Sequence, residues 1–208
     1  MLFRSDTMGT IRKPIKKTSI EKKKRIIEKG FELMCNKGYH NVSCVDIAKY
    51  AGVSTGLIYQ YFTDKKDIFL EGVKDYSNKI MFPMINILDN KAFDKNNLRD
   101  ILSQMIDSFI NTHTMKKEAH EELMAMSHLD EKVGELFNQN ELKMTENISN
   151  LLINNDMNIK NVEEKVHIIM GLVDNYCHEV VYHHHKKLNY DIMREEVLDT
   201  ILFILNKD

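Results

Sequence analysis

One stretch of the sequence, from Ser43 to Lys66, constrains the fold more than any other. It contains two short helical patterns separated by a turn at 51–54, Ala-Gly-Val-Ser. Apolar residues such as Ile47 and Ile58 recur on one face of each pattern. Two helices joined by a short turn that contains glycine form a helix-turn-helix, in which the second helix enters the major groove of DNA. The stretch therefore predicts a DNA-reading motif.

Local signals mark the ends of these two helices. Ser43 is a natural N-cap, and Asp46, three residues later, has the place of the acid in a capping box. Gly52 is expected to adopt the positive φ of the turn, which a β-branched residue adopts only at a cost. Ser54 can cap the second helix, and Gly56 within that helix indicates close approach to another surface.

The charge of the chain is unevenly distributed. The net charge is only −2, but residues 1–66 carry 14 Lys/Arg against 6 Asp/Glu, and the remainder carries 15 against 25. Neutralisation of phosphates supplies most of the non-specific affinity of proteins for DNA. A basic head that coincides with a helix-turn-helix is thus consistent with double-stranded DNA as a partner.

The rest of the chain predicts helices. Hydrophobic residues make up 43%, charged residues 29%, and only eight Gly and two Pro interrupt 208 residues. We expect an all-α fold of about nine helices, in which an N-terminal helix-turn-helix domain of three helices precedes a C-terminal helical bundle. Outside the motif, helical patterns cover residues 19–37, 64–89, 97–113, 117–127, 130–154, 161–185 and 191–206.

These patterns divide the chain into three parts. Residues 1–18 form a basic arm, which either reaches a minor groove or is a disordered leader. Residues 19–66 form the DNA-binding domain, and residues 67–208 form a domain for ligand binding and dimerisation. Thr63 is expected to cap the helix over 64–89, and Pro83 is expected to kink it.

Several other classes of protein receive little support. No apolar run approaches the ~20 residues of a membrane span, and no signal peptide is evident, so we expect a cytoplasmic protein without a membrane partner. Neither a nucleophile elbow nor a phosphate-binding glycine loop occurs, so we expect no cofactor and no catalysis. A di-iron bundle needs two Glu-x-x-His motifs, and only Glu164–His167 is present.

The histidines do not predict a metal site. His183, His184 and His185 are adjacent, and neighbouring residues on a helix point about 100° apart. His178 shares a face with His185 but lies two turns away, and no cysteine pair completes a tetrahedral set. A polar helix end explains these residues better.

The stretch 46–69, "DIAKYAGVSTGLIYQYFTDKKDIF", resembles the DNA-binding signature of TetR-family transcriptional regulators. The matching residues include the Ile47-Ala48 pair, the turn at 51–54, Gly56 and the Tyr61-Phe62 pair. The resemblance covers about residues 19–70. The remainder is similar to the family only in length and helical character.

The resemblance implies roles for eight positions. Ser43, Tyr59, Tyr61 and Lys65 fall where the family contacts phosphates. Ser54, Thr55, Gly56 and Gln60 fall where its recognition helix faces the groove. The chemistry agrees, because hydroxyl and ammonium groups position the DNA backbone, while Gln60 or Thr55 can read base edges. Each tyrosine could instead be a half-buried core residue.

The resemblance also implies an effector pocket and a homodimer. Met-rich interiors adapt to apolar ligands, although methionine is also an ordinary core residue. Asp174 could meet a cationic ligand, a histidine or water, and Pro83 could transmit the signal. The candidate ligand-binding residues are Met105, Phe109, Met124, Met144, Asp174 and Tyr176. The candidate dimer-interface residues, on the last two helices, are Val166, Met170, Val173, Val181, Val197, Ile201 and Leu205.

Together these patterns predict a regulator, most simply a repressor, that binds a pseudo-palindromic operator as a homodimer and is released by a small molecule. Two alternatives stay open. The chain could be a helix-turn-helix activator or DNA binder without a small-molecule ligand, or an all-helical enzyme.

Overall fold

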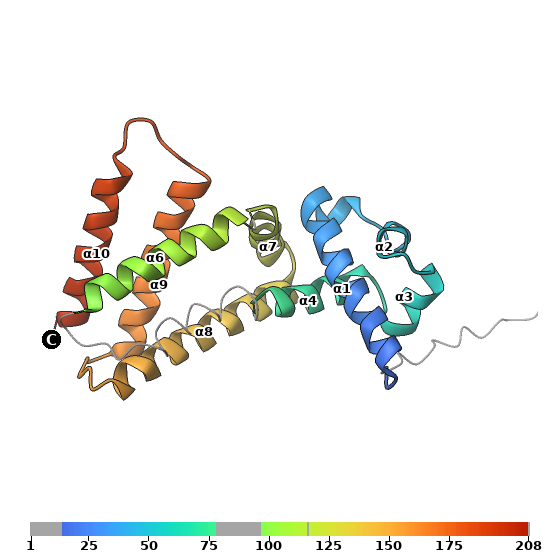
Figure 1. The fold of residues 1–208 in the computed structure, drawn as a ribbon, viewed down its shortest axis with the longest axis horizontal. Coiled ribbons are helices and arrows are strands. Elements are labelled where there is room, and N and C mark those ends of the chain that lie inside the picture. The colour runs from blue at the N-terminus through green and yellow to red at the C-terminus, as the bar shows by residue number, and fades with distance from the viewer. Residues whose placement is uncertain (1–13, 78–96, 116, 208) are drawn as a thin grey trace, which may run out of the picture. The chain divides into compact units, whose positions relative to one another are not determined.

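The computed structural model describes residues 14–77, 97–115 and 117–207, and these residues form helices without strands (Figure 1). The all-α prediction is confirmed. The helices are α1 (Lys17–Lys37), the 3-10 turn η1 (Tyr39–Asn41), α2 (Cys44–Ala51), α3 (Thr55–Tyr61), α4 (Lys65–Tyr76), α6 (Leu98–Met115), α7 (Lys117–Leu129), α8 (Glu131–Asn154), α9 (Val162–Val181) and α10 (Tyr190–Asn206).

The chain packs as two compact units. The first contains Met1–Asp75 together with Glu118–Gly134, and the second contains Tyr76–Lys117 together with Glu135–Asp208. This grouping assigns most of α4 and α7 to the unit that carries the helix-turn-helix. The predicted functional boundary after residue 66 stays a prediction. The first thirteen residues of the predicted arm lie outside the described residues. The last two residues of the predicted arm, 17 and 18, already belong to α1, which begins at Lys17.

In the first unit, α1 packs against α2 through one apolar face. Ile26, Ile27 and Met34 of α1 are buried, as is Ile47 of α2. Ile20, in the first turn of α1, is 50% exposed. The core of this unit therefore fixes the helices around α2 and leaves the start of α1 in solvent.

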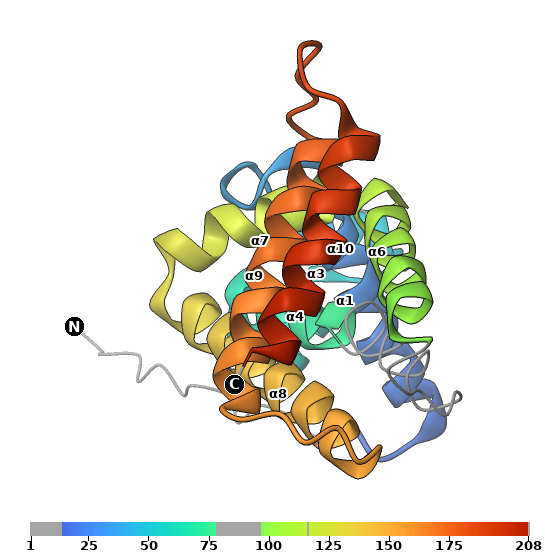
Figure 2. The same ribbon diagram turned by 90° about the vertical axis from the view of Figure 1, so that its left-hand side faces the viewer.

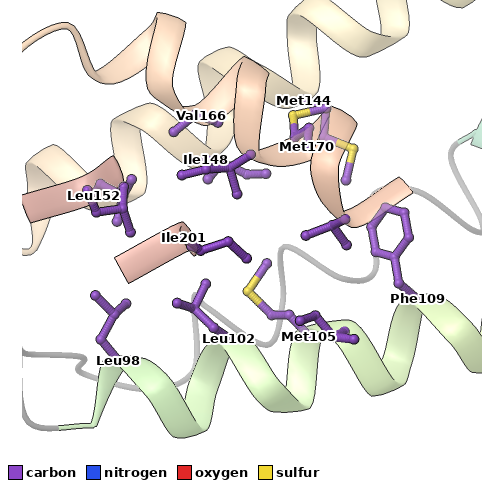
Figure 3. Close-up of a pocket in the computed structure, with 14 residues that line it drawn as sticks. Leu98, Leu102, Met105, Phe109, Met144, Ile148, Leu152, Val166, Met170 and Ile201 are labelled. Carbon is purple, nitrogen blue, oxygen red and sulfur yellow. The ribbon is translucent and has the colours of Figure 1, made fainter. Parts of the chain in front are cut away.

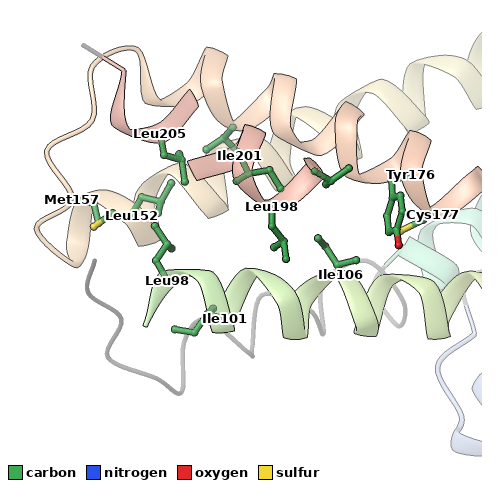
Figure 4. Packing of buried hydrophobic residues seen from close by; sticks show 12 residues of the cluster. Leu98, Ile101, Ile106, Leu152, Met157, Tyr176, Cys177, Leu198, Ile201 and Leu205 are labelled. Atoms are coloured by element: carbon green, nitrogen blue, oxygen red, sulfur yellow. The ribbon is translucent and has the colours of Figure 1, made fainter. Parts of the chain in front are cut away.

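In the second unit, α6, α9 and α10 pack together, and α9 and α10 lie side by side (Figure 2). Apolar residues from these helices, from the end of α8 and from the loop that follows α8 form one buried cluster (Figure 4). Its members are Leu98, Ile101, Ile106, Leu152, Met157, Val166, Tyr176, Cys177, Val197, Leu198, Ile201 and Leu205. This cluster stabilises the unit mainly through removal of apolar surface from water.

Two helix ends differ from the sequence prediction. Asp64, rather than Thr63, caps α4, since its Oδ1 accepts from the N–H groups of Lys66 (2.8 Å) and Asp67 (3.1 Å). A carboxylate reaches these free N–H groups and also favours the positive end of the helix dipole. The helix predicted over residues 161–185 is α9, and it ends at Val181. Pro83 lies outside the described residues.

The membrane prediction can be tested on the described helices. None of them combines the length and the apolarity that crossing a bilayer requires.

Candidate DNA-binding surface and ligand cavity

The start of α2 is fixed by the predicted capping box. The Ser43 N–H donates to Asp46 Oδ2 at 2.9 Å, and the Asp46 N–H donates to Ser43 Oγ at 3.2 Å. The Ser43 hydroxyl also donates to Asp46 Oδ2 at 2.5 Å. This hydrogen bond is the main reason that the pKa of the Asp46 carboxyl is lowered. Ser43 itself is exposed, so its capping role leaves its surface open to a partner.

The turn between the two helices adopts the predicted backbone. Gly52 has φ 65° and ψ 42°, and its N–H donates to the carbonyls of Ala48 and Lys49. Ser54 caps α3, because its Oγ accepts from the Leu57 N–H at 3.3 Å. The turn and the two caps together fix the direction in which α3 leaves α2.

The outward face of α3 consists of the predicted recognition residues. Gly56, Tyr59 and Gln60 are exposed and Thr55 is half-buried. An added Cβ at Gly56 would meet nothing within 4 Å, so the glycine leaves the middle of this face flat. Exposed hydroxyl, phenol and amide groups on one helix face offer hydrogen bonds that base edges and phosphates can accept or donate.

The two tyrosines of α3 have different environments. Tyr59 is 55% exposed, whereas Tyr61 is 7% exposed and packs edge-on against Phe62. This burial favours the core role for Tyr61, one of the two roles that the sequence left open. Tyr59 shares a hydrogen bond with the thiol of Cys44. Repulsion between a Cys44 thiolate and a Tyr59 phenolate is the largest cause that raises the pKa of Tyr59, and the hydrogen bond and burial contribute less. The phenol therefore stays a neutral donor at physiological pH.

Lys65 has a structural role that the sequence did not reveal. Its ammonium donates to the carbonyls of Tyr39 (2.7 Å) and Val42 (2.8 Å), and it lies 4.4 Å from the centroid of the Tyr39 ring. Lys65 thus ties α4 to the segment that leads into α2. Its predicted phosphate contact stays a prediction. An ammonium has three N–H donors, and the two carbonyls use two of them, so a third donor is available for a phosphate.

The basic residues of α1 lie in the same unit as α3. Lys22, Lys24 and Arg25 are exposed, and Lys23 places its ammonium 5.3 Å from the centroid of the Phe62 ring. Arg25 Nη2 lies 3.5 Å from the carbonyl of Gly52, in the turn before α3. The charge asymmetry in the sequence was the signal for this cluster, and the structure adds its link to the turn.

The second unit contains an apolar cavity of about 80 Å³ (Figure 3). Met105 and Phe109 of α6 and Met144 of α8, three of the candidate ligand-binding residues, line it. The other lining residues are also apolar: Leu98, Leu102, Ile106, Ile148, Leu152, Val166, Ile169, Met170, Val173, Ile201 and Leu205. Such a cavity can bind an apolar group, and within the described parts of the chain its lining offers no hydrogen-bonding side chain to orient a polar one.

Three of the predicted ligand-binding residues are not among those that line the cavity. Met124 belongs to α7, in the first unit. Tyr176 is buried and donates from its hydroxyl to the carbonyl of Tyr190 at 3.1 Å. Asp174 faces His113 and His178 instead. Helical periodicity identified their helices correctly but could not identify which neighbour each side chain meets.

Most of the predicted dimer-interface residues contribute to packing within the single chain. Val166, Val197, Ile201 and Leu205 are at most 8% exposed in the single chain, where they pack into its own core. Met170 and Val173 line the cavity, and Val181 is half-buried. The four buried side chains have little surface left for a second copy, whereas a role of Met170, Val173 and Val181 in a dimer stays a prediction. Apolar residues that the same two helices do expose are Ile168, Ile192 and Phe203.

Capped short helices, a left-handed glycine turn and an exposed α3 face define a helix-turn-helix protein with a second helical unit. Residues 26–71 match the model of the family described as "Bacterial regulatory proteins, tetR family". Residues 26–71 thus carry the DNA-binding domain of the TetR family, as the signature predicted.

Two curated relatives are bacterial regulators. The "Fatty acid metabolism regulator protein" of Bacillus subtilis is 29% identical over 113 residues, which are 54% of this chain and 58% of that protein. The "HTH-type transcriptional regulator HbdR" of Aromatoleum sp. is 44% identical over 55 residues, which are 26% of this chain and 24% of that protein. The chain thus spans less than two thirds of these relatives.

Solved structures share the fold along most of the chain. A TetR-family transcriptional regulator from Mesorhizobium loti has a TM-score of 0.72 at 17% identity, and the match covers 91% of this chain and 98% of that protein's chain. A transcriptional regulator from Saccharomonospora viridis in complex with choline has a TM-score of 0.67 at 22% identity, with 90% and 97% covered. These relatives and neighbours are regulators and not enzymes, in agreement with the prediction of no catalysis.

Proposed function

We propose that this protein regulates transcription in the bacterial cytoplasm by placing α3 in the major groove of an operator. The observation that carries the proposal is the exposed face of α3, with Thr55, Gly56 and Gln60 held by a capped, fixed turn. Thr55 and Gln60 would read base edges, and Ser43 and Tyr59 would contact phosphates. The basic residues of α1 would add attraction that does not depend on sequence.

The DNA contact can be tested by exchanging single side chains on α3. Gln60→Ala should change the base preference in a selection from random duplexes, because an amide that reads a base edge contributes about 1–3 kcal/mol of discrimination. Lys49→Ala, an exposed change on α2, is the matched control for loss of a surface side chain. An unchanged preference for Gln60→Ala would show that this residue does not read bases.

We further propose a homodimer built on α9 and α10, through their exposed face rather than the buried residues first predicted. Ile168 (60% exposed), Ile192 (59%) and Phe203 (67%) supply apolar surface there, and Gly171 leaves open space that permits close approach. Two-fold symmetry of a dimer would match a pseudo-palindromic operator.

Phe203→Glu tests the dimer directly. A carboxylate in the centre of an apolar interface should shift the sedimentation mass towards the monomer, because a buried unpaired charge is costly. Ile153→Glu on α8 replaces an apolar residue of similar exposure (53%) outside the proposed face and should leave the mass unchanged. A dimer that persists with Phe203→Glu would exclude this face.

The proposed effector is an apolar molecule of the acyl-chain type. Every side chain that the described residues contribute to the cavity lining is hydrocarbon or thioether, and one curated relative is a fatty acid metabolism regulator. A quaternary ammonium ligand such as choline is usually held by several aromatic rings. Phe109 is the one aromatic side chain that the described residues supply to the lining, so this part of the cavity suits an acyl chain better than the choline of the structural neighbour.

The size of the cavity sets the form of the ligand experiment. An engineered cavity of about 150 Å³ accepts benzene, so about 80 Å³ admits only part of an acyl chain unless Met105 and Met144 move. Methionine side chains adapt readily because they are unbranched. We therefore expect binding to strengthen over short saturated fatty acids and then level off.

Thermal shift against a series of fatty acids, with choline in parallel, tests this expectation. A ligand at a hundred times its Kd stabilises the native state by about 2.7 kcal/mol. Leu102→Phe, which fills the cavity, should abolish the shift, whereas Leu129→Phe, an exposed change on α7, should not. A shift with choline alone would overturn the acyl proposal, and no shift with any compound would favour a DNA binder without a small-molecule ligand.

Release of DNA by such a ligand requires a difference in affinity. The ligand can shift the protein away from its DNA-binding state only if it binds another state more tightly. A repressor predicts that the fatty acid which raises the melting temperature also weakens operator binding in the same concentration range. An effector that strengthens operator binding would favour an activator or a co-repressed regulator.

A further inference from the structure

Two histidines and an aspartate from α6 and α9 come together in the second unit. Asp174 Oδ1 lies 3.6 Å from His113 Nε2, and Asp174 Oδ2 lies 3.7 Å from His178 Nε2. The candidate ligand atoms of these three residues all lie within 4.8 Å of one another. Asp174 and His178 are one helical turn apart on α9, and His113 projects from α6.

The spacing of these atoms suits the shell of a metal ion. Ligands that are about 2.1 Å from a zinc ion in a tetrahedral arrangement are about 3.4 Å from each other. The separations of 3.6 and 3.7 Å are close to that value, and both exceed the length of a good hydrogen bond. A small closure of the site around an ion would complete the geometry.

His113 also has the outer partner that metal-bound histidines commonly have. Its Nδ1 lies 2.9 Å from the carbonyl of Phe109. A carbonyl only accepts, so Nδ1 carries a proton, and the lone pair of the neutral ring is on Nε2, the atom that faces Asp174. This arrangement fixes the tautomer and the ring orientation that coordination through Nε2 requires.

Aromatic rings hold the two histidines in place. Phe109 stacks on His113 with 5.5 Å between centroids, and the Tyr182 ring lies 5.0 Å from that of His178. The side chain of His113 is only 6% exposed and that of His178 24%, whereas that of Asp174 is 45% exposed. The cluster is therefore enclosed on the histidine side and exposed on the carboxylate side, where water or another ligand can complete a coordination shell.

We propose that His113, Asp174 and His178 form a binding site for one divalent transition-metal ion, such as Zn²⁺, Co²⁺ or Fe²⁺. Two imidazoles and one carboxylate favour these ions, whereas Mg²⁺ and Ca²⁺ prefer shells made of oxygen. The sequence analysis considered only the histidines of one helix and found no convergent set. The missing ligand, His113, is supplied by a second helix 61 positions before Asp174, a pairing that a helical pattern does not contain.

The site is distinct from the exposed run at His183–His185. That run follows the end of α9 and could bind metal ions weakly as any exposed histidine run does. Phe109 connects the proposed site to the apolar cavity, since it lines the cavity and stacks on His113. The metal proposal needs neither DNA nor an effector and stands apart from the proposed function.

The experiment uses the full chain after treatment with a chelator. Titration with Co²⁺ should produce visible d–d absorption that saturates at one ion per chain, and Zn²⁺ should displace it. Asp174→Asn and His178→Gln should each weaken binding at least about tenfold. A control that replaces both His184 and His185 by Gln should retain the one-ion signal, and circular dichroism should show every variant folded.

Three results would overturn the proposal. The first is a folded wild-type chain that binds no ion under these conditions, in which case the cluster is a histidine–aspartate ion pair. The second is Co²⁺ binding that is lost only in the His184/His185 variant, which would assign it to the exposed run. The third is an unchanged Co²⁺ spectrum in both Asp174→Asn and His178→Gln.

Discussion

Lys65 provides a prediction in which stability and DNA binding can be separated. Its ammonium donates to the carbonyls of Tyr39 and Val42 and lies over the Tyr39 ring. Lys65→Ala removes both donors at a half-buried position. Hydrogen bonds to charged groups contribute about 1.5–3 kcal/mol each, but water can reach the carbonyls, so we expect a loss of about 2–3 kcal/mol for the pair.

The loss is measurable by thermal and urea unfolding. For a chain of this size 1 kcal/mol shifts Tm by about 2–4 °C, so Lys65→Ala should lower Tm by roughly 5–10 °C. Lys74→Ala, at the other end of α4, is the matched control. Its partner Glu71 is 3.5 Å away in an exposed pair that contributes at most about 0.5 kcal/mol.

The same variant tests the phosphate contact. If the third donor of Lys65 reaches a phosphate, Lys65→Ala should weaken binding to all duplexes alike and reduce the salt slope by about 1 per chain. An unchanged slope together with the lower Tm would assign Lys65 a purely structural role. A Tm within 1 °C of wild type would refute the reasoning from the two carbonyl contacts.

Two further predictions follow from close packing and burial. An added Cβ at Gly72 would meet the Phe31 side chain at 2.5 Å, so Gly72→Ala should destabilise the protein by about 1–3 kcal/mol in urea unfolding. Gly56→Ala is the control and should not destabilise it, because the added Cβ meets nothing within 4 Å. A Gly72→Ala variant as stable as wild type would contradict the close packing of Gly72 against Phe31. Burial raises the pKa of the Cys177 thiol to about 12, and Cys177 is 0% exposed. Iodoacetamide at neutral pH should therefore modify Cys44 in the folded protein but reach Cys177 only after unfolding. Equal alkylation rates of the two thiols by mass spectrometry would contradict the burial of Cys177.

The features that the sequence predicted well are local. Ser43 and Asp46 form the expected capping box, and Gly52 adopts the left-handed turn, because caps and turns depend on residues within a few positions of one another. The residues assigned to the DNA-facing side of α3 came from the resemblance to the TetR signature, and the structure leaves Gly56, Tyr59 and Gln60 exposed there. Even here Asp64 replaced Thr63 as the cap of α4, since a serine, threonine or aspartate at adjacent positions satisfies the same pattern.

The features that the sequence did not predict depend on which elements meet. Periodicity showed that Val197 and Ile201 share an apolar face, but it could not show that this face belongs to the core of one chain. Likewise Met105 lines the cavity and Met124 does not, although both lie on amphipathic helices. The contact of Lys65 with Tyr39 joins residues 26 positions apart, beyond the reach of any helical repeat.

The central claim is that α3 reads DNA as one half of a symmetric pair. Footprinting on a duplex obtained by selection with the full chain tests it most directly. We expect a two-fold symmetric protected site with half-site centres about one helical turn, or a multiple of one, apart, and an altered base preference when Gln60 is replaced. Absence of sequence-specific protection, or a single protected half-site with no symmetric counterpart, would contradict it.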